Sequence, residues 1–380
     1  MRSARERSAR GVALRALMEI DAGARANRIV PDLLSESGLD ARDRHLVTEL
    51  TYGSCRMQRA CDWLTGRYSR GRLDPQVRSA LRLGAYQLGW TRIPTHAAVS
   101  ATVAEVQGPG RSVVNAVLRR VAGDVDRGLV TWPDAATQLS YPDWIVERLT
   151  SDLGRSRAEA ALRTMNEAAS VSQRADGYIQ DPASQMIAAH LRPLAVDGPL
   201  LDMCAAPGGK ATGLAGHGLV VAADLSEGRA RVVAENAARL DTIGLDTVVA
   251  DGTAAPFRAA SFGLVLVDAP CSGLGVLRRR PDARWRITPG DIDRLAALQR
   301  RLISSAAELV RPGGVLAYSV CTLSVTETAG IDNWLRRESP ALRPLPPPGP
   351  PWEPAGRGAL LLPQTAGTDG MFLLVLRVPG

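Results

Sequence analysis

Short apolar runs that alternate with helical segments from residue 199 onward constrain the fold of this chain more than any other feature. Strands separated by helices favour a parallel sheet with helices packed on its faces. We therefore predict an α/β, Rossmann-like domain over residues 176–380, with the last two runs, GALLLP and MFLLVLRV, forming a terminal hairpin. The five main runs are PLLDMC, LVVAAD, DTVVAD, FGLVLVD and GVLAYSV, with helical segments between them at about 209–216, 226–240, 291–310 and 325–337.

The first third of the chain has a different pattern. Apolar residues recur there at helical spacing, and no segment alternates as a strand would. We predict an all-α domain over residues 1–122 and a mostly helical connector over 123–175. The expected helices of the all-α domain are 5–21, 27–37, 41–65, 74–90, 95–106 and 111–122.

Positive charge is concentrated in the same part of the chain. Residues 1–130 contain 21 Arg and 13 acidic residues, whereas the whole chain has a net charge of +7. Charge asymmetry of this kind favours a polyanionic partner such as nucleic acid. Aromatic residues make up only 4% of the chain, which argues against a base-stacking platform.

Cysteine and histidine usage argues against two other classes of site. The chain has five Cys, none in a CxxC pair, and four His, so neither a disulfide framework nor a metal site is expected. Cys55 and Cys61 lie at helical apolar positions and are predicted core residues.

No apolar run approaches the ~20 residues of a membrane span, and the N-terminus lacks the apolar core of a signal peptide. We expect a cytoplasmic protein with no membrane partner.

The stretch CAAPGGKAT, residues 204–212, follows the first predicted strand and opens a helix. Gly208 and Gly209 allow the backbone to approach a ligand at the helix N-terminus. The stretch matches neither GxGxxG nor the phosphate-binding GxxxxGK[ST] pattern. Lys210 is the only lysine, beside 45 Arg, which indicates that a compact ammonium on a flexible stem is needed there.

Acidic residues end three neighbouring runs. Asp224, Asp251 and Asp268 end the second, third and fourth predicted strands, so they are expected at one edge of the sheet. A carboxylate at Asp224 is placed to hold ribose hydroxyls. The alternative is that such acids only cap turns or helices. A nucleoside cofactor without a required phosphate site fits the group better, and it points to S-adenosylmethionine.

Two cysteines, Cys271 in DAPCSG and Cys321 in YSVCTL, each follow an apolar run and are expected to face one pocket. Carbon 5 of cytosine is too weak a nucleophile to accept a methyl group unless a thiolate first adds to carbon 6. One thiol then attacks and a second group assists release. Asp268 is placed to stabilise the protonated adduct. The alternative is a pair of buried structural cysteines.

The motifs CAAPGGK, DAPCSGLG, YSVCTLS and DGMF resemble the RsmB/Sun (Fmu) family of RNA cytosine-5 methyltransferases, and residues 5–122 resemble the NusB-like RNA-binding domain that those enzymes carry. The resemblance implies that Cys321 is the nucleophile and Cys271 promotes product release, with Asp268 and Lys210 beside them. It also implies 16S ribosomal RNA as substrate, and we expect a monomer. The implied cofactor site consists of Cys204, Ala205, Ala206, Pro207, Gly208, Gly209, Lys210, Asp224, Asp251 and Asp268.

Two departures from that family pattern stand out. Val320 precedes Cys321 where the family usually has Thr. About ten residues separate the NE at 166–167 from the QD at 180–181, where relatives have a long segment with its own strands, and this affects substrate docking more than cofactor binding. The alternatives are an RNA-binding protein with an inactive methyltransferase fold, a cytosine-5 methyltransferase with another RNA target, and an amino-methyltransferase, whose NPPY-like loop has no counterpart in DAPC.

Overall fold

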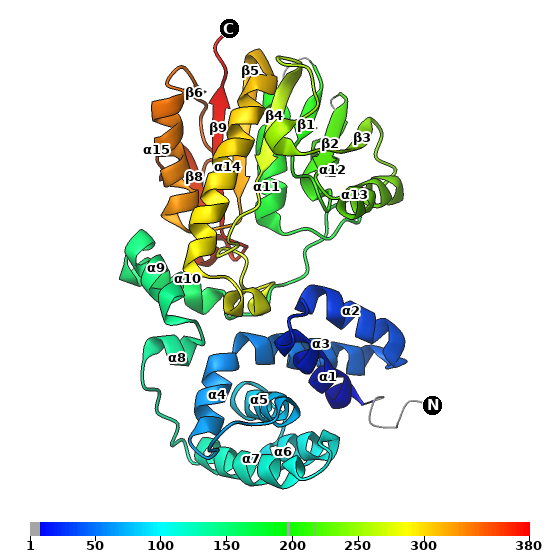
Figure 1. Ribbon diagram of the computed structural model, residues 1–380, viewed down its shortest axis with the longest axis vertical. Coiled ribbons are helices and arrows are strands. Elements are labelled where there is room, and N and C mark those ends of the chain that lie inside the picture. The colour runs from blue at the N-terminus through cyan, green and yellow to red at the C-terminus, as the bar shows by residue number, and fades with distance from the viewer. Residues whose placement is uncertain (1–7, 196–197, 217) are drawn as a thin grey trace. The chain divides into compact units, whose positions relative to one another are not determined.

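The computed structural model describes residues 8–195, 198–216 and 218–380. The chain divides into two compact units, which are visible in Figure 1. One contains Met1–Glu147 together with the distant segment Arg279–Arg286, and the other contains Arg148–Arg278 and Ile287–Gly380. In the described part of the chain, no helix is long and apolar enough to cross a membrane.

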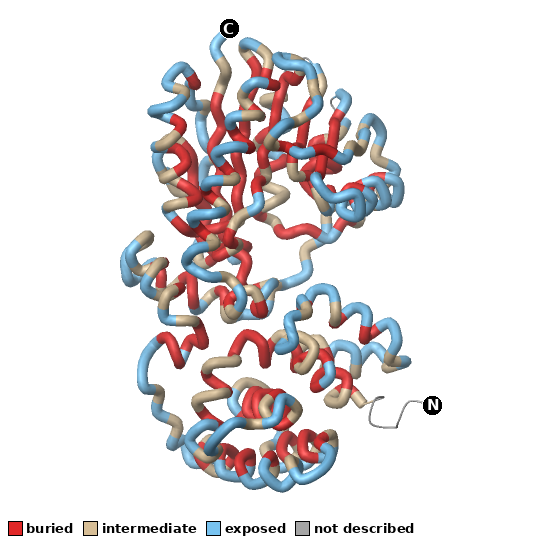
Figure 2. Tube along the Cα trace, viewed as in Figure 1, coloured by how far each residue is buried: buried red, intermediate tan, exposed pale blue. Residues whose placement is uncertain are grey.

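All regular secondary structure in the described part of the first unit is helical, as the spacing of its apolar residues predicts. Its central helix α5 is buried along most of its length, as Figure 2 shows. The predicted helix 41–65 is interrupted at Met57, which leaves the helical conformation and ends α3. The predicted start at residue 5 lies outside the described residues. The helices are α1 Ala9–Asp21, α2 Ala26–Ser37, α3 Ala41–Arg56, α4 Gln58–Gly66, α5 Pro75–Trp90, α6 Thr95–Glu105, α7 Gly110–Asp126 and α8 Ala135–Leu139, with α9 Asp143–Leu153 spanning the boundary of the units.

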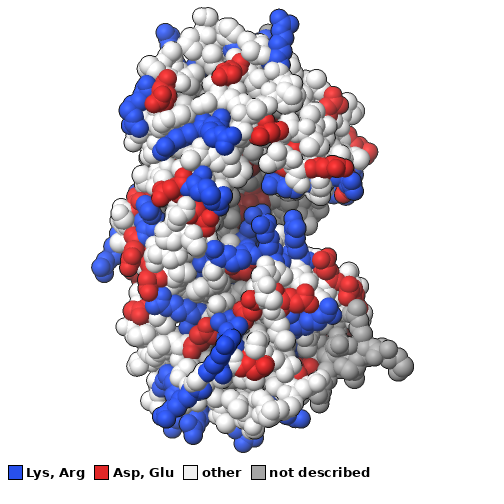
Figure 3. All heavy atoms as spheres, in the orientation of Figure 1, with Lys and Arg blue, Asp and Glu red and all other residues white. Residues whose placement is uncertain are grey.

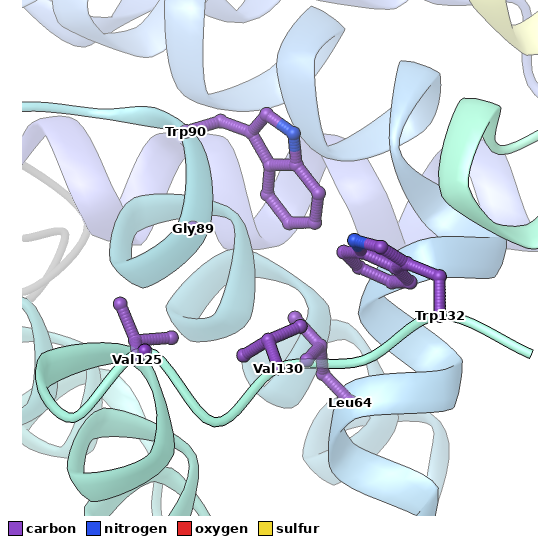
Figure 4. A pocket seen from close by; sticks show the side chains of 7 residues that line it. Leu64, Gly89, Trp90, Val125, Val130 and Trp132 are labelled. Atoms are coloured by element: carbon purple, nitrogen blue, oxygen red, sulfur yellow. The ribbon is translucent and has the colours of Figure 1, made fainter.

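The low aromatic content of the chain conceals a local concentration in this helical unit. The rings of Trp63 and Trp132 lie 5.1 Å apart, and those of Trp90 and Trp132 lie 6.1 Å apart. Trp90 and Trp132 line a pocket of about 320 Å³ together with Leu64 and Val130, shown in Figure 4. Aromatic rings are thus gathered at one place that a count over the whole sequence does not reveal.

The segment Arg279–Arg286 belongs to the helical unit although it lies far along the chain. Arg284 is fully buried, with its guanidinium 3.9 Å from the ring centre of Tyr141. This guanidinium donates to the carbonyl oxygens of Arg56 and Ser140 at 3.2 and 3.0 Å. Trp285 donates its indole N–H to the carbonyl of Cys55 at 2.6 Å. The alternation of apolar runs in the sequence does not predict that this segment packs with the helical unit.

The second unit is built on a mixed sheet whose order is β3-β2-β1-β4-β5-β9-β8-β7, with β6 also paired to β9. Strands β1 to β5 are parallel, and β9 runs antiparallel to β5 and β8, which confirms the predicted hairpin. Every residue of β1 and β2 is buried, as expected for parallel strands covered on both faces. The strands are β1 Leu200–Asp202, β2 Val220–Asp224, β3 Leu245–Val249, β4 Phe262–Asp268, β5 Val310–Val320, β6 Arg343–Pro344, β7 Glu353–Ala355, β8 Gly358–Leu361 and β9 Met371–Arg377.

The sheet order reverses direction at β1, which pairs with β2 on one side and β4 on the other. The crevice beyond the carboxyl ends of strands at such a switch point is where open α/β sheets bind ligands.

The predicted helix 325–337 is divided into a 3-10 turn, η5 Val325–Glu327, and α15. The helices of this unit are α10 Arg155–Thr164, α11 Pro182–Leu191, α12 Gly209–Leu214, α13 Glu227–Arg239, α14 Pro289–Leu309, α15 Ala329–Glu338 and α16 Pro363–Ala366.

Candidate active site

The two cysteines selected from the sequence lie in contact with each other. Cys271 follows β4 and Cys321 follows β5, and these strands are parallel neighbours with Asp268 paired to Ser319. The two Sγ atoms are 3.3 Å apart. Neither thiol is in a disulfide bond, and both are partly buried. The ends of adjacent strands thus bring two groups that are distant in sequence to one point.

The contact between the thiols changes their acid–base properties. The pKa of Cys271 is raised well above its usual range, first by its hydrogen bond with Cys321, then by burial, and further by the negative charges of Cys321 and Glu327. A thiol that donates to a neighbouring thiolate stabilises the anion on that neighbour. The raised pKa keeps Cys271 protonated, so its thiol can donate to the Cys321 sulfur.

Lys210 and Asp268 form an ion pair at the same strand ends. The Nζ atom of Lys210 lies 2.7 Å from Oδ2 of Asp268, and Ser319 donates to Oδ1 of Asp268 at 2.9 Å. Burial lowers the pKa of Lys210, but the charge and hydrogen bond of Asp268, together with the charge of Cys321, more than offset it, so the pKa is raised. Lys210 is therefore an ammonium, and its positive charge would stabilise a thiolate on Cys321.

The loop before α12 requires glycine at two positions. Gly208 has a φ of 102°, in the left-handed region that favours glycine. A Cβ atom at Gly209 would lie 2.8 Å from Nε2 of Gln180 and 2.9 Å from the ring of Tyr178, so a larger residue does not fit there. Pro207 is exposed, Cys204 and Ala206 are partly buried, and Ala205 is buried.

The short join contributes to this loop as well. Arg174 donates to the carbonyl of Gly209 at 2.7 Å, and its guanidinium lies 4.9 Å from the ring centre of Tyr178. Gln173 and Ile179 form an isolated antiparallel bridge, so the join makes a compact turn. The residues that precede α11 therefore buttress the glycine loop, a role that the sequence does not reveal.

Two carboxyl groups flank the glycine loop, and only one of them was selected from the sequence. Asp224, buried at the end of β2, accepts from the backbone of Ala206 and Ser226 and pairs with Arg229 at 3.1 Å. Asp202 ends β1 and is 1% exposed, and neither of its oxygens has a hydrogen-bond partner among the described residues. Burial and the charge of Asp268 raise the pKa of Asp202 to about 7.

An orphaned buried carboxyl group indicates a missing hydrogen-bond partner. S-adenosylmethionine carries an ammonium group and ribose hydroxyls, which are the donors that Asp202 and Asp224 could accept from. These carboxyl groups and the glycine loop beside them therefore fit that cofactor. Asp202 could have been found in the sequence by the criterion that selected the other acids, because it ends the run PLLD.

Asp251 differs from the other acidic residues of the group. It follows the edge strand β3 and is exposed. One oxygen accepts from both the backbone and the hydroxyl of Thr253 at 2.8 Å, which lowers the pKa of Asp251. Its contacts within the chain are those of a turn cap, and a role toward the cofactor stays a prediction. Within the described ranges, no cluster of three His, Cys, Asp or Glu side chains could hold a metal ion.

Comparison with known proteins identifies the family of this chain. The family model for the 16S rRNA methyltransferase RsmB/F matches residues 188–377, and that of the NusB family matches residues 7–123. A Mycobacterium tuberculosis (strain H37Rv) protein with a provisional methyltransferase name is 36% identical over 97% of this chain and 96% of its own length. The ribosomal RNA small subunit methyltransferase B of Thermus thermophilus is 35% identical over 97% of each chain.

Two further observations concern length and fold. The alignment with the M. tuberculosis protein runs over 443 positions, more than the 380 residues of this chain, so that relative contains residues that this chain lacks. The crystal structure of PH0851 matches with a TM-score of 0.78 at 19% identity over 99% of both chains, which shows the same fold. The predicted fold class is thereby confirmed. The chain belongs to the RsmB/F family of S-adenosylmethionine-dependent RNA cytosine-5 methyltransferases and carries a NusB-family domain before its methyltransferase domain.

Proposed function

We propose that this protein methylates carbon 5 of a cytosine in 16S ribosomal RNA, with Cys321 forming a covalent bond to the base and Cys271 assisting its release. The contact of the two Sγ atoms at 3.3 Å carries the proposal. A single nucleophile does not require a second thiol at this distance, whereas a reaction with separate attack and release steps has a use for a second group there.

The electrostatics of the site favour Cys321 as the attacking group. The ammonium of Lys210 attracts negative charge on Cys321, whereas the carboxylate of Glu327 raises the pKa of Cys271. A cation lowers the free energy of a nearby thiolate and an anion raises it. The thiolate is therefore more stable on Cys321, and the thiol proton is retained on Cys271.

The proposed reaction proceeds in two steps. The Cys321 sulfur gives an electron pair to carbon 6, which forms the S–C6 bond and makes the electron pair of the C5=C6 bond available at carbon 5; Asp268 stabilises the proton on the ring nitrogen. S-adenosylmethionine, when bound, supplies the electrophilic methyl group. Transfer of the carbon 5 proton to water then restores the C5=C6 bond as the S–C6 bond breaks and the Cys321 thiolate leaves. Cys271 assists this second step.

We assign cofactor binding to the glycine loop, with Asp224 toward the ribose. RNA binding is assigned to the helical unit, where Arg side chains lie across the face drawn in Figure 3, with acidic side chains between them. The small-subunit target is supported by relatives such as the ribosomal RNA small subunit methyltransferase B of Thermus thermophilus. Sequencing of methylcytosine in rRNA from cells with and without the gene would identify the modified nucleotide. Methylation confined to another RNA would refute the 16S assignment.

Two variants test the covalent mechanism. Cys321→Ala should abolish methyl transfer and any adduct, because no other group attacks carbon 6. Cys271→Ala should still form the adduct and remain bound to its product, which a denaturing gel with unmodified rRNA would show as a slow protein band. The double variant is the matched control and should give no band. A band from Cys321→Ala that disappears with Cys271→Ala would reverse the two roles, and full activity of both variants would refute the covalent mechanism.

A further inference from the structure

A buried carboxylate beneath the two thiols is not used by the reaction steps above. Glu327 ends the 3-10 turn η5 and has no exposed surface. Burial raises the pKa of Glu327, and hydrogen bonds from neutral groups oppose that rise. Placing a carboxyl group in the interior is costly unless donors satisfy its oxygens. Such a group is expected to have a function that an apolar residue could not perform.

The donors to Glu327 come from both loops that carry a thiol. Ser272, the residue after Cys271, donates its backbone N–H to Oε1 at 2.8 Å and its hydroxyl to Oε2. Thr322, the residue after Cys321, donates its hydroxyl to Oε2 at 3.2 Å. The two hydroxyl oxygens are also 2.7 Å apart. One carboxylate therefore connects the immediate neighbours of both sulfur atoms.

The same carboxylate is fixed to the body of the sheet domain. Gln299 of α14 donates to Oε1 at 3.0 Å and also to the carbonyl of Pro270 at 2.9 Å, one residue before Cys271. Tyr318 of β5 donates its hydroxyl to Gln299 at 2.9 Å and to the backbone carbonyl of Glu327 at 2.7 Å. Gln299 and Tyr318 are both buried. A network of hydrogen bonds thus connects the two loops to α14 and β5.

We propose that Glu327 is a positioning residue for this reaction: it acts through Ser272 and Thr322 to hold the sulfur atoms of Cys271 and Cys321 at their working separation. The inference rests on the proposed covalent mechanism. The Glu327 carboxylate accepts four hydrogen bonds: two from Ser272, one from Thr322 and one from Gln299. A carboxylate can accept all four at once, whereas an amide has a single acceptor oxygen and two N–H groups that need acceptors of their own. Glu327→Gln therefore preserves the volume of the side chain but breaks the network.

The first test isolates the attack step. In a Cys271→Ala background, the rate of adduct formation on unmodified rRNA measures only the attack of Cys321 on carbon 6. Adding Glu327→Gln should slow adduct formation by roughly 10- to 100-fold, because a misplacement of about 1 Å at a reacting group costs up to about 100-fold in rate. In the otherwise wild-type protein, Glu327→Gln should lower kcat while KM for rRNA and cofactor affinity change by less than about twofold.

Asp332 provides a matched control. It is a fully buried carboxylate only five residues further on, but its hydrogen bonds go to Arg357, away from the thiol loops. Asp332→Asn should lower thermal stability without the selective loss of adduct formation. An equal loss in both variants, accompanied by weaker cofactor binding, would indicate a structural role for Glu327 and overturn the proposal.

The remaining outcomes are also informative. If Glu327→Gln binds cofactor normally and forms the adduct at the rate of its background, the positioning role is refuted while the covalent mechanism stands. If Glu327→Gln does not bind cofactor, Ser272→Ala decides in its place: it removes one hydroxyl and keeps the backbone donor, and slower adduct formation supports the proposal whereas an unchanged rate refutes it. Turnover in Cys321→Ala would instead refute the mechanism on which both proposals depend.

Discussion

Replacement of Lys210 by Met would remove the only lysine of the chain while nearly preserving its length. Two effects are expected, because the ammonium pairs with Asp268 at 2.7 Å and also attracts the Cys321 thiolate. Breaking a fully buried pair costs about 3–5 kcal/mol and an exposed pair contributes up to about 1 kcal/mol. The side chain of Lys210 is 9% exposed and that of Asp268 is 29% exposed, so we expect an intermediate loss of stability of about 2 kcal/mol.

The effect on the reaction should be distinguishable by its pH dependence. Without the cation, the Cys321 thiolate is less stable, so its pKa rises and the acidic limb of the single-turnover rate profile moves to higher pH. The rate near neutral pH should fall by roughly 100-fold, the scale for losing one preorganised electrostatic contact. Lys210→Arg keeps the charge and is the control: its acidic limb should stay in place even if its rate is lower.

The pH dependence of thermal stability provides a separate check on the charge of Lys210. The pKa of Lys210 is raised in the folded protein, so its contribution is complete below the unfolded value of about 10.4 and is lost only at higher pH. The ammonium itself therefore adds no pH dependence to the stability difference between wild type and Lys210→Met below about pH 9; any change near pH 7 comes from Asp202, whose pKa the charge of Lys210 lowers. A rate profile for Lys210→Met that superimposes on the wild-type profile after scaling would refute the role of the ammonium in thiolate formation.

Two further predictions concern the cofactor side of the site. Asp224→Ala should weaken S-adenosylmethionine binding by roughly 1–3 kcal/mol, the scale of a charge-assisted hydrogen bond, and unchanged affinity by calorimetry would contradict a ribose role. The pKa of Asp202 is raised to about 7, so the folded protein holds a proton that the unfolded chain releases, and stability falls as pH rises toward 7. Asp202→Asn should therefore stabilise the cofactor-free protein more at pH 8 than at pH 5 in thermal melts, while weakening cofactor binding; equal melting shifts at both pH values would contradict the raised pKa.

The sheet and the position of the two thiols could be predicted because parallel strands that are buried on both faces have nearly continuous apolar sequences. A residue that follows such a run must lie at the carboxyl edge, and this places Cys271 and Cys321 near each other. The pattern does not encode which hydrogen bonds a polar residue makes. Glu327 was therefore missed, because it lies within a stretch predicted as part of a helix.

The sequence also did not predict that the segment Arg279–Arg286 belongs to the helical unit. Arg284 and Trp285 lie between two elements of the sheet domain in the sequence, and nothing in the spacing of apolar residues shows that they pack with helices more than a hundred residues earlier. The break at Met57 has the same origin: the apolar period continues through it, while the backbone changes direction. Tertiary packing decides both features.

The excursion of Arg279–Arg286 also affects the order of events during synthesis. The helical unit consists of Met1–Glu147 together with this later segment, so roughly 130 residues must be translated before its last piece emerges. At about 5–20 residues per second, the ribosome needs roughly 7–26 seconds for that interval. During this time the ring of Tyr141 and the carbonyls of Cys55, Arg56 and Ser140 lack the Arg284 and Trp285 side chains that cover them in the finished protein. The first domain to leave the ribosome is thus completed only after most of the second has been made.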